Sequence, residues 1–207
     1  MPKVINPGKL TIICGPMFSG KTTELMRRIN RARSIGSSVF VVHSQKDTRY
    51  SKDHICTHLQ DKIPSHPCRN LDDLRENQEY QKADIIAIEE AQFFDSLYDF
   101  VVEEVDFNGK HIILSGLDGD YQRIPFKCNG QMDLLRLIPM ADKIFKLTAY
   151  CHQCLDETPA IFTHLVRTQN DSEENLKEIK KNNGVILGGL DKFVALCRKH
   201  YLEATQN

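Results

Sequence analysis

The sequence predicts an α/β protein in which a mostly parallel sheet is flanked by helices, followed by a smaller C-terminal domain. Three observations lead to this prediction. Strand-like and helix-like segments alternate over residues 1–149, a glycine-rich motif joins the first strand to the first helix, and two Cys/His pairs follow residue 149. Strands that alternate with helices form right-handed βαβ units and a parallel sheet. We therefore expect two domains, residues 1–149 and 150–207.

Five short apolar segments have the composition of parallel strands buried on both faces. They are residues 9–14, 38–43, 85–88, 112–114 and 144–148.

Helical patterns lie between these strands. Apolar residues recur at helical spacing within 22–35 and 95–107, and Gly36 and Gly109 follow them as stop signals. Asn70 is the expected cap of a short helix that runs through Lys82. A fourth helix is expected over 131–138, ended by Pro139. The stretch 46–67 has no clear period, and we expect a long loop there, which in a compact domain usually carries function.

The charge balance excludes some functions. Lys and Arg number 27 against 28 Asp and Glu, a formal net charge of -1, whereas proteins that grip duplex DNA show a basic excess. The first residues lack the apolar core of a signal peptide, and runs such as 39–42 are too short to span a bilayer. Seven cysteines in such a chain fit a reducing compartment. We therefore expect a soluble, cytoplasmic protein that binds neither membrane nor DNA or RNA.

The first motif that carries chemistry follows the first predicted strand. It matches G-x-x-x-x-G-K-[ST] in full, with the residues Gly15, Pro16, Met17, Phe18, Ser19, Gly20, Lys21 and Thr22. Glycines let backbone N–H groups turn toward a phosphate, and the helix N-terminus adds partial positive charge. Lys21 is expected to reach the β- and γ-phosphates and Thr22 to ligate Mg²⁺. The motif predicts a nucleoside-triphosphate site.

A pair of carboxylates, Glu89 and Glu90, follows the predicted strand 85–88. At a strand end that faces the phosphates, one carboxylate can hold Mg²⁺ or its water while the other accepts a proton. Acidic residues also follow buried strands as an ordinary solvated loop, but the phosphate-binding motif favours the functional interpretation.

Two Cys/His pairs have the spacing of metal ligands. Cys151 and Cys154 form a C-x₂-C pair, and Cys197 and His200 form a C-x₂-H pair. Two such pairs can hold one tetrahedral ion, and four protein ligands without an open position are typical of a structural site. A chance pairing of unrelated cysteines and a ligand role for His152 in place of His200 are the alternatives.

Ordered matches along most of the chain point to a known family. The matching segments are 15–22, 46–50, 89–94, 116–119, 122–126, 146–149 with the Cys pair behind it, 188–193 and 197–200. The sequence resembles the type II thymidine kinases of cytosolic, bacterial and viral origin. The likeness is collinear from about residue 9 to residue 201.

The resemblance implies ATP-dependent phosphorylation of the 5′-hydroxyl of thymidine to thymidine monophosphate, with Glu90 as the base that accepts the hydroxyl proton. It implies ATP, Mg²⁺ and a structural zinc ion as cofactors. Glu89 stands where the family generally has Asp, and Ala91 stands where Gly is frequent. Beside the motif at 15–22, the implied cofactor-binding residues are Asp47, Thr48, Arg49, Glu89 and Gln92.

The resemblance also implies a nucleoside pocket. Tyr121 would lie against the pyrimidine base and Met17 and Leu117 would line the space for its 5-methyl group, although Tyr121 and Phe126 could equally be packed core residues. A lasso segment between the two metal-ligand pairs would close over the nucleoside, with main-chain groups reading the base. The implied substrate-binding residues are Met17, Leu117, Tyr121, Phe126, Gly184, Val185, Ile186, Leu187, Gly188 and Phe193, where the family commonly has Tyr in place of Phe193.

Further implied partners are deoxyuridine as a second substrate, thymidine triphosphate as a feedback inhibitor and three more copies of the chain in a homotetramer. Two alternatives remain at this point: a P-loop kinase for another deoxynucleoside, and an ATP-switched zinc-ribbon module that binds nucleic acid. A GTP switch is disfavoured, because the chain has no Asn-Lys-x-Asp motif.

Overall fold

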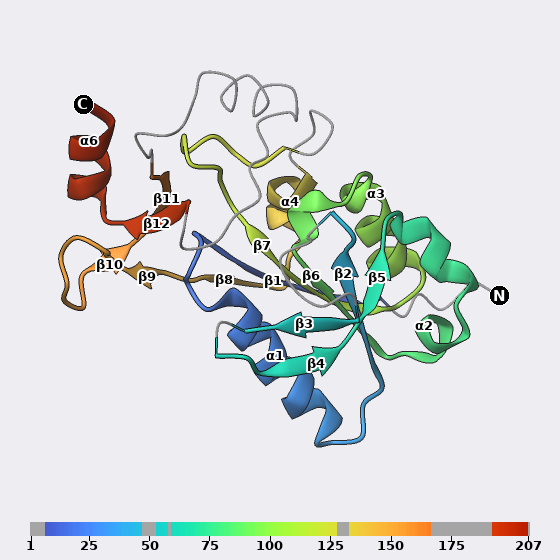
Figure 1. Ribbon diagram of the computed structural model, residues 1–207. Helices are drawn as coiled ribbons and strands as arrows, with labels where there is room; N and C mark the ends of the chain where they lie inside the picture. The colour runs from blue at the N-terminus through green and yellow to red at the C-terminus, as the bar shows by residue number, and fades with distance from the viewer. Residues whose placement is uncertain (1–6, 47–52, 58, 128–132, 167–191, 207) are drawn as a thin grey trace.

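A six-stranded parallel sheet forms the centre of the computed structural model, which describes residues 7–46, 53–57, 59–127, 133–166 and 192–206 (Figure 1). Its strand order is β5-β2-β6-β7-β1-β8, and every neighbouring pair is parallel. The strands are β1 (Lys9–Gly15), β2 (Val39–Ser44), β5 (His66–Cys68), β6 (Ile85–Glu89), β7 (His111–Leu117) and β8 (Lys143–Lys146). The predicted fold class is confirmed, and all five predicted strands belong to this sheet.

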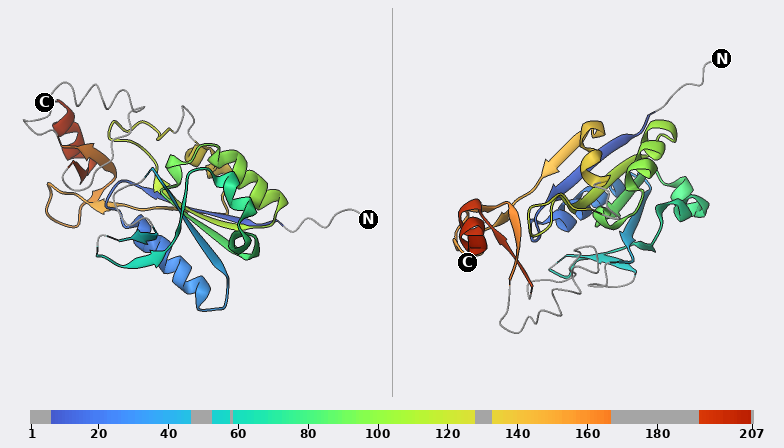
Figure 2. Two further views of the ribbon diagram at one scale, coloured as in Figure 1. Left: turned by 45° about the vertical axis from the view of Figure 1, so that its right-hand side comes forward. Right: turned by 90° about the horizontal axis from the view of Figure 1, so that it is seen from above.

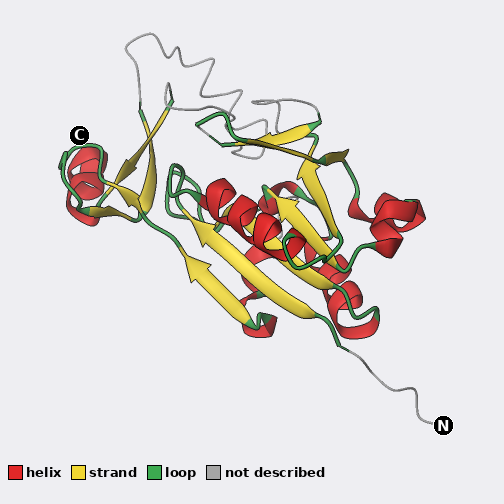
Figure 3. Ribbon diagram, turned by 90° about the horizontal axis from the view of Figure 1, so that it is seen from below, coloured by secondary structure: helices red, strands yellow, loops and turns green. Residues whose placement is uncertain are grey.

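One face of the sheet is covered by α1 (Lys21–Arg33), which lies along the strands in Figure 3. Leu25, Met26 and Ile29 of α1 are buried against β-branched residues of the strands. A short antiparallel hairpin of β3 (His54–Cys56) and β4 (Lys62–Pro64) adds Ile55 and Ile63 to the same apolar cluster. The apolar stripe of α1 therefore fixes its position on the sheet.

The opposite face carries the remaining helices of the first 149 residues. They are the 3-10 helices η1 (Leu71–Glu76), η2 (Ala91–Phe93) and η4 (Ile138–Met140), the helices α2 (Gln78–Lys82), α3 (Leu97–Val102) and α4 (Asp133–Arg136), and the single π-helical turn η3 (Glu103–Phe107). Their apolar residues and those of the strands form one large core, which includes the fully buried Phe94, Leu97 and Ile112.

A smaller unit lies beyond the carboxyl ends of the central strands (Figure 2). It contains β9 (Ala149–Tyr150) paired with β10 (Pro159–Ala160), β11 (Phe162–Leu165) paired with β12 (Phe193–Leu196), and the C-terminal helix α6 (Arg198–Gln206). It has its own small apolar cluster, against which Phe18 packs from the loop after β1. Among the described residues, no helix is both long and apolar enough to cross a membrane.

Several predicted boundaries are wrong. The segment 46–67 is not simply a loop, because its described part contains β3, β4 and the start of β5, which pairs with β2. Strands of three residues with mixed polarity carry no readable period, and only their partners define them. The helix expected after Asn70 is divided at Asn77, whose side chain caps α2 by accepting N–H groups of Glu79 and Tyr80.

The fourth predicted helix also differs. Residues 131 and 132 lie outside the described residues, and α4 ends at Arg136, before Pro139. Pro139 sits in the first turn of η4, a position where its missing N–H costs nothing.

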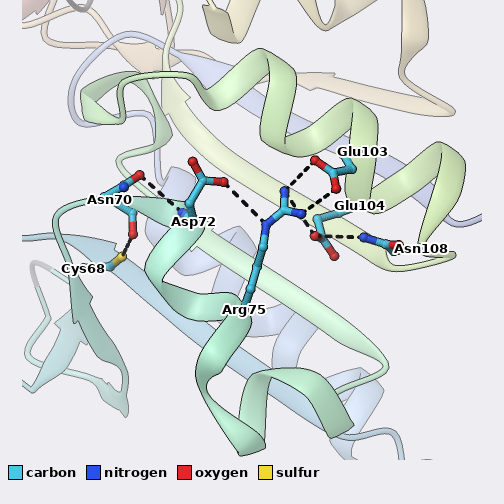
Figure 4. Close-up of polar contacts among 7 residues, drawn as sticks. All are labelled: Cys68, Asn70, Asp72, Arg75, Glu103, Glu104 and Asn108. Carbon is cyan, nitrogen blue, oxygen red and sulfur yellow. Dashed lines mark hydrogen bonds and ion pairs between the residues drawn. The ribbon is translucent and has the colours of Figure 1, made fainter.

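A charged network joins η1 to η3 on the face of the sheet opposite α1 (Figure 4). The Arg75 guanidinium donates two hydrogen bonds to Glu103, of 2.5 and 2.8 Å, and lies 3.6 Å from Oε1 of Glu104. The side chain of Glu104 is 3% exposed and accepts one hydrogen bond of 3.1 Å from Asn108 Nδ2. Because a buried carboxylate needs a nearby cation, the Arg75 guanidinium, which also binds Glu103, partly offsets the charge of Glu104.

Arg75→Ala should lower the free energy of unfolding by about 1–3 kcal/mol, because the buried Glu104 carboxylate then loses the guanidinium beside it. Urea denaturation followed by circular dichroism measures this loss. The matched control is Arg27→Ala, which removes an exposed arginine that pairs with Glu24 within α1. Equal stability of the two variants would contradict a role for Arg75 in neutralising Glu104.

Candidate active site

The loop between β1 and α1 has the conformation that a phosphate cradle requires. Gly15 has φ +149°, and a Cβ atom there would lie 2.5 Å from the backbone oxygen of Leu147, so only glycine fits. Gly20 adopts a left-handed conformation immediately before the first residue of α1. The Nζ atom of Lys21 donates a hydrogen bond of 2.7 Å to the carbonyl oxygen of Pro16, as does the Ser19 hydroxyl at 2.8 Å. Lys21 is thus held beside the loop at the N-terminus of α1, where the helix dipole favours anions.

Thr22 and Glu89 form the second part of the site. The Thr22 hydroxyl donates a hydrogen bond to Oε1 of Glu89, which joins the start of α1 to the end of β6. Oε2 of Glu89 is buried and has no hydrogen-bond partner among the described residues. Burial and the adjacent Glu90 raise the pKa of Glu89 to about 7.

This pair fits a divalent cation. A hydroxyl oxygen and a carboxylate oxygen are ligands that Mg²⁺ accepts, directly or through water, and the buried Oε2 lacks the partner that such an ion would supply. A bound cation would also favour the ionised form of Glu89.

Glu90 occupies a strained position at the end of β6. Its backbone is left-handed, with φ 51° and ψ 44°, a conformation that costs a non-glycine residue about 1–2 kcal/mol. Its carboxylate accepts a hydrogen bond from Nε2 of Gln92, and Oε1 of Gln92 accepts one of 3.0 Å from the backbone N–H of Leu117. Gln92 therefore bridges Glu90 and the end of β7, a contact that the sequence did not indicate.

Of the predicted nucleoside residues that the structure describes beyond the phosphate loop, Leu117 ends β7, Tyr121 and Phe126 follow it, and Phe193 lies in β12 of the smaller unit. Leu117, Tyr121 and Phe126 are partly buried, whereas Phe193 is buried in β12 opposite Leu165. Phe126 packs edge-on against Phe93 with the ring centroids 5.4 Å apart. Phe93 belongs to the matching segment 89–94, but the motif gave no sign that it would contact Phe126.

Met17 connects the phosphate loop to the smaller unit. Its backbone N–H donates a hydrogen bond of 3.0 Å to the buried hydroxyl of Thr163 in β11. Thr163 is a possible contributor from the sequence but is not among the predicted site residues. The contact joins residues 146 positions apart, so only the folded chain reveals it.

Cys151, Cys154, Cys197 and His200 come together as the spacing predicts. Their ligand atoms all lie within 4.8 Å of one another, and Nδ1 of His200 is 3.3 Å from the sulfurs of both Cys151 and Cys154. Burial opposes ionisation of Cys151, but the N–H of Cys197 and the His200 ring outweigh it and lower the pKa of this thiol to about 6.

Three cysteines and one histidine at this separation are compatible with a tetrahedral zinc ion. His200 belongs to the cluster and His152, which is exposed, does not. Nε2 of His200 lies 3.9 Å from a carboxylate oxygen of Glu203, on the side where metal-bound histidines commonly meet such a group.

Some predicted residues lie outside the described ranges. These are Asp47, Thr48, Arg49, Gly184, Val185, Ile186, Leu187 and Gly188.

A phosphate loop after the buried strand β1, together with the acidic end of β6, the next parallel strand but one, is typical of P-loop proteins, which bind nucleoside triphosphates. Comparison with known proteins narrows this class. The sequence model of the family described as thymidine kinase matches residues 8–201. The chain belongs to the thymidine kinase family.

Relatives from distant organisms agree with this assignment. "Thymidine kinase a" of Arabidopsis thaliana is 43% identical over 201 residues, which cover 94% of this chain and 75% of the relative. The rice "Thymidine kinase" is 38% identical over 95% of this chain and 67% of its own length. The human "Thymidine kinase, cytosolic" is 36% identical over 95% of this chain and 74% of its own length.

Cys154→Ser should lower the zinc content of the purified protein well below the expected value of about one ion per chain, because an alcohol is a poor zinc ligand. Elemental analysis of the protein measures this loss. Cys56→Ser is the control, since Cys56 is a free thiol outside the cluster. His200→Cys should keep the metal, and a zinc-free wild-type protein of full activity would refute a structural zinc.

Proposed function

We propose that the protein transfers the γ-phosphoryl group of ATP to the 5′-hydroxyl of thymidine, with Glu90 as the general base. The observation that carries this role is the position of Glu90. It directly follows Glu89, which contacts Thr22 of the phosphate loop, and it connects through Gln92 to the nucleoside side of the site. Its carboxylate therefore stands between the residues expected to hold the two substrates. Membership of the thymidine kinase family favours neither alternative, a P-loop kinase for another deoxynucleoside or an ATP-switched zinc-ribbon module that binds nucleic acid.

The phosphate side would be formed by the loop at 15–22. Lys21 is already within reach of the loop backbone, and on binding it would exchange its bond to Pro16 for a phosphate oxygen. Thr22 and Glu89 would hold Mg²⁺, which neutralises charge on the phosphates. Glu89 has one more methylene than the aspartate that the family generally has there, and its hydrogen bond to Thr22 supports its reach to the same place. Asp47, Thr48, Arg49 and Gln92 complete the proposed cofactor-binding set.

The nucleoside side would combine aromatic and apolar contacts with main-chain recognition. Tyr121 would lie against the base, and Met17, Leu117 and Phe126 would enclose it. Main-chain groups of residues 184–188 would read the acceptor–donor–acceptor edge of thymine. Phe193 is buried in β12 and has no hydroxyl, so its role would be to pack behind the nucleoside pocket.

The smaller unit would hold zinc through Cys151, Cys154, Cys197 and His200 and so fix the two ends of the lasso segment. Its separate apolar cluster supports a domain boundary at residue 149.

We further propose a cytoplasmic homotetramer that also accepts deoxyuridine and is inhibited by thymidine triphosphate. The family resemblance supports these assignments, and the name of the human relative places that protein in the cytosol.

Glu90→Gln keeps the shape of the side chain but removes the proton acceptor. Phosphoryl transfer to thymidine should therefore fall by about 10²- to 10⁴-fold, while ATP still binds. Steady-state transfer of radiolabelled phosphate, together with calorimetric titration of ATP, separates the two effects. Glu76→Gln is the control, because Glu76 is exposed at the end of η1. A Glu90→Gln enzyme with normal turnover would exclude Glu90 as the base.

The proposed recognition of the base predicts a definite order of substrates. Thymidine and deoxyuridine should both react, with thymidine ahead by the contribution of one buried methyl group. Deoxycytidine should react on the order of 10²-fold less efficiently, because each unpaired buried polar group costs about 1–3 kcal/mol. Deoxyguanosine should not be phosphorylated, because its two-ring base is larger than the space for one ring that Tyr121, Met17 and Leu117 would leave. Values of kcat/KM for the four nucleosides test this, and equal efficiency on deoxycytidine would refute main-chain recognition of thymine.

A further inference from the structure

Tyr201 connects the C-terminal helix to the loop that carries Tyr121. It is 3% exposed and directly follows His200 of the Cys/His cluster in α6. Its hydroxyl donates a hydrogen bond of 2.7 Å to the backbone carbonyl oxygen of Tyr121, which lies 80 residues earlier in the chain. We propose that Tyr201 is a positioning residue that fixes the main chain at Tyr121 and thereby the ring that meets the pyrimidine base. This inference rests on the proposed role of Tyr121 in binding thymidine.

The ring of Tyr201 is itself held on several sides. Phe162 of β11 packs against it with the ring centroids 5.0 Å apart, and the Arg123 guanidinium lies 4.8 Å from its centroid. His164 meets it edge-on at 5.8 Å. Contacts of this kind with aromatic and cationic groups restrict the ring. These contacts aim the hydroxyl at the carbonyl oxygen of Tyr121.

The loop around Tyr121 is closed mainly on itself. Oδ1 of Asp120 accepts the N–H groups of Gln122 and Ile124, both at 2.9 Å, and the N–H of Asp120 donates to the carbonyl oxygen of Ile124. These bonds shape the turn but do not attach it to another element.

The ends of this segment are attached elsewhere. Asp118 forms an ion pair of 2.7 Å with Lys146 at the end of β8, and Phe126 packs on Phe93. Near its middle, Tyr121, His164 and Tyr201 border a cavity of about 680 Å³, so dense packing does not fix the loop there. Arg123 stacks on the rings of Phe162 and Tyr201, and the hydrogen bond from Tyr201 fixes the main chain at Tyr121 itself.

The position of Tyr201 also connects the Cys/His cluster to the loop at Tyr121. α6 begins at Arg198, between the cluster residues Cys197 and His200, and Tyr201 lies in the same first turn. The cluster residues hold this turn, and the turn holds the loop.

The test compares Tyr201→Phe with Tyr150→Phe in the full-length protein. Tyr201→Phe keeps the ring and its packing but removes the donor, whereas Tyr150 is 70% exposed and lies next to the cluster residue Cys151. Loss of one hydrogen bond should raise KM for thymidine by about 2- to 10-fold in Tyr201→Phe. We expect kcat, KM for ATP and zinc content to stay at wild-type values, and Tyr150→Phe to match the wild type throughout.

A second measurement needs no substrate. Hydrogen exchange of the amides in 118–126 should become faster in Tyr201→Phe, while exchange in β11, β12 and α6 stays the same. Unchanged KM for thymidine together with unchanged loop exchange would overturn the proposal. So would a fall in zinc content and thermal stability accompanied by equal losses for both substrates, because that pattern indicates a general role in folding. If the wild type does not phosphorylate thymidine but loop exchange still responds, the proposed function fails while the positioning contact stands.

Discussion

The hydrogen bond between Thr22 and Glu89 is the contact around which the site is arranged. It joins the first turn of α1 to the end of β6, two places that meet because β1, β7 and β6 run parallel and end at the same edge of the sheet. A parallel sheet brings the carboxyl ends of its strands together, whatever their order in the sequence. The phosphate loop after β1 and the carboxylates after β6 thus face one site.

The strained backbone of Glu90 is accompanied by a hydrogen bond that holds its side chain. A left-handed backbone at Glu90 turns the chain sharply just after Glu89, so that the two adjacent carboxylates can make different contacts. The buried Gln92 side chain then fixes the second carboxylate and at the same time accepts the N–H of Leu117. One amide group, using both its donor and its acceptor, couples the proposed base to the segment that leads to the nucleoside.

The smaller unit touches the active site in more than one place. Thr163 receives the N–H of Met17 within the phosphate loop, Phe18 packs on its apolar cluster, and Tyr201 holds the carbonyl of Tyr121. The Cys/His cluster lies close to these contacts: Cys151 and Cys154 follow β9, Cys197 lies between β12 and α6, and His200 is in α6. A zinc ion held by this cluster would make a unit with so small an apolar core more rigid, and this rigidity would extend to both proposed substrate sides.

The sequence by itself determined the features that are local in the chain. The pattern from Gly15 to Thr22, the apolar runs of the central strands and the C-x₂-C and C-x₂-H spacings each predict their structure, because the interacting residues are close in sequence or share a simple period. Only the tertiary structure decided the rest. β5 becomes a strand through pairing with β2, Phe93 meets Phe126, Thr163 meets Met17 and Tyr201 meets Tyr121. Such contacts join single residues far apart in the chain, and neither composition nor periodicity encodes which of them will meet.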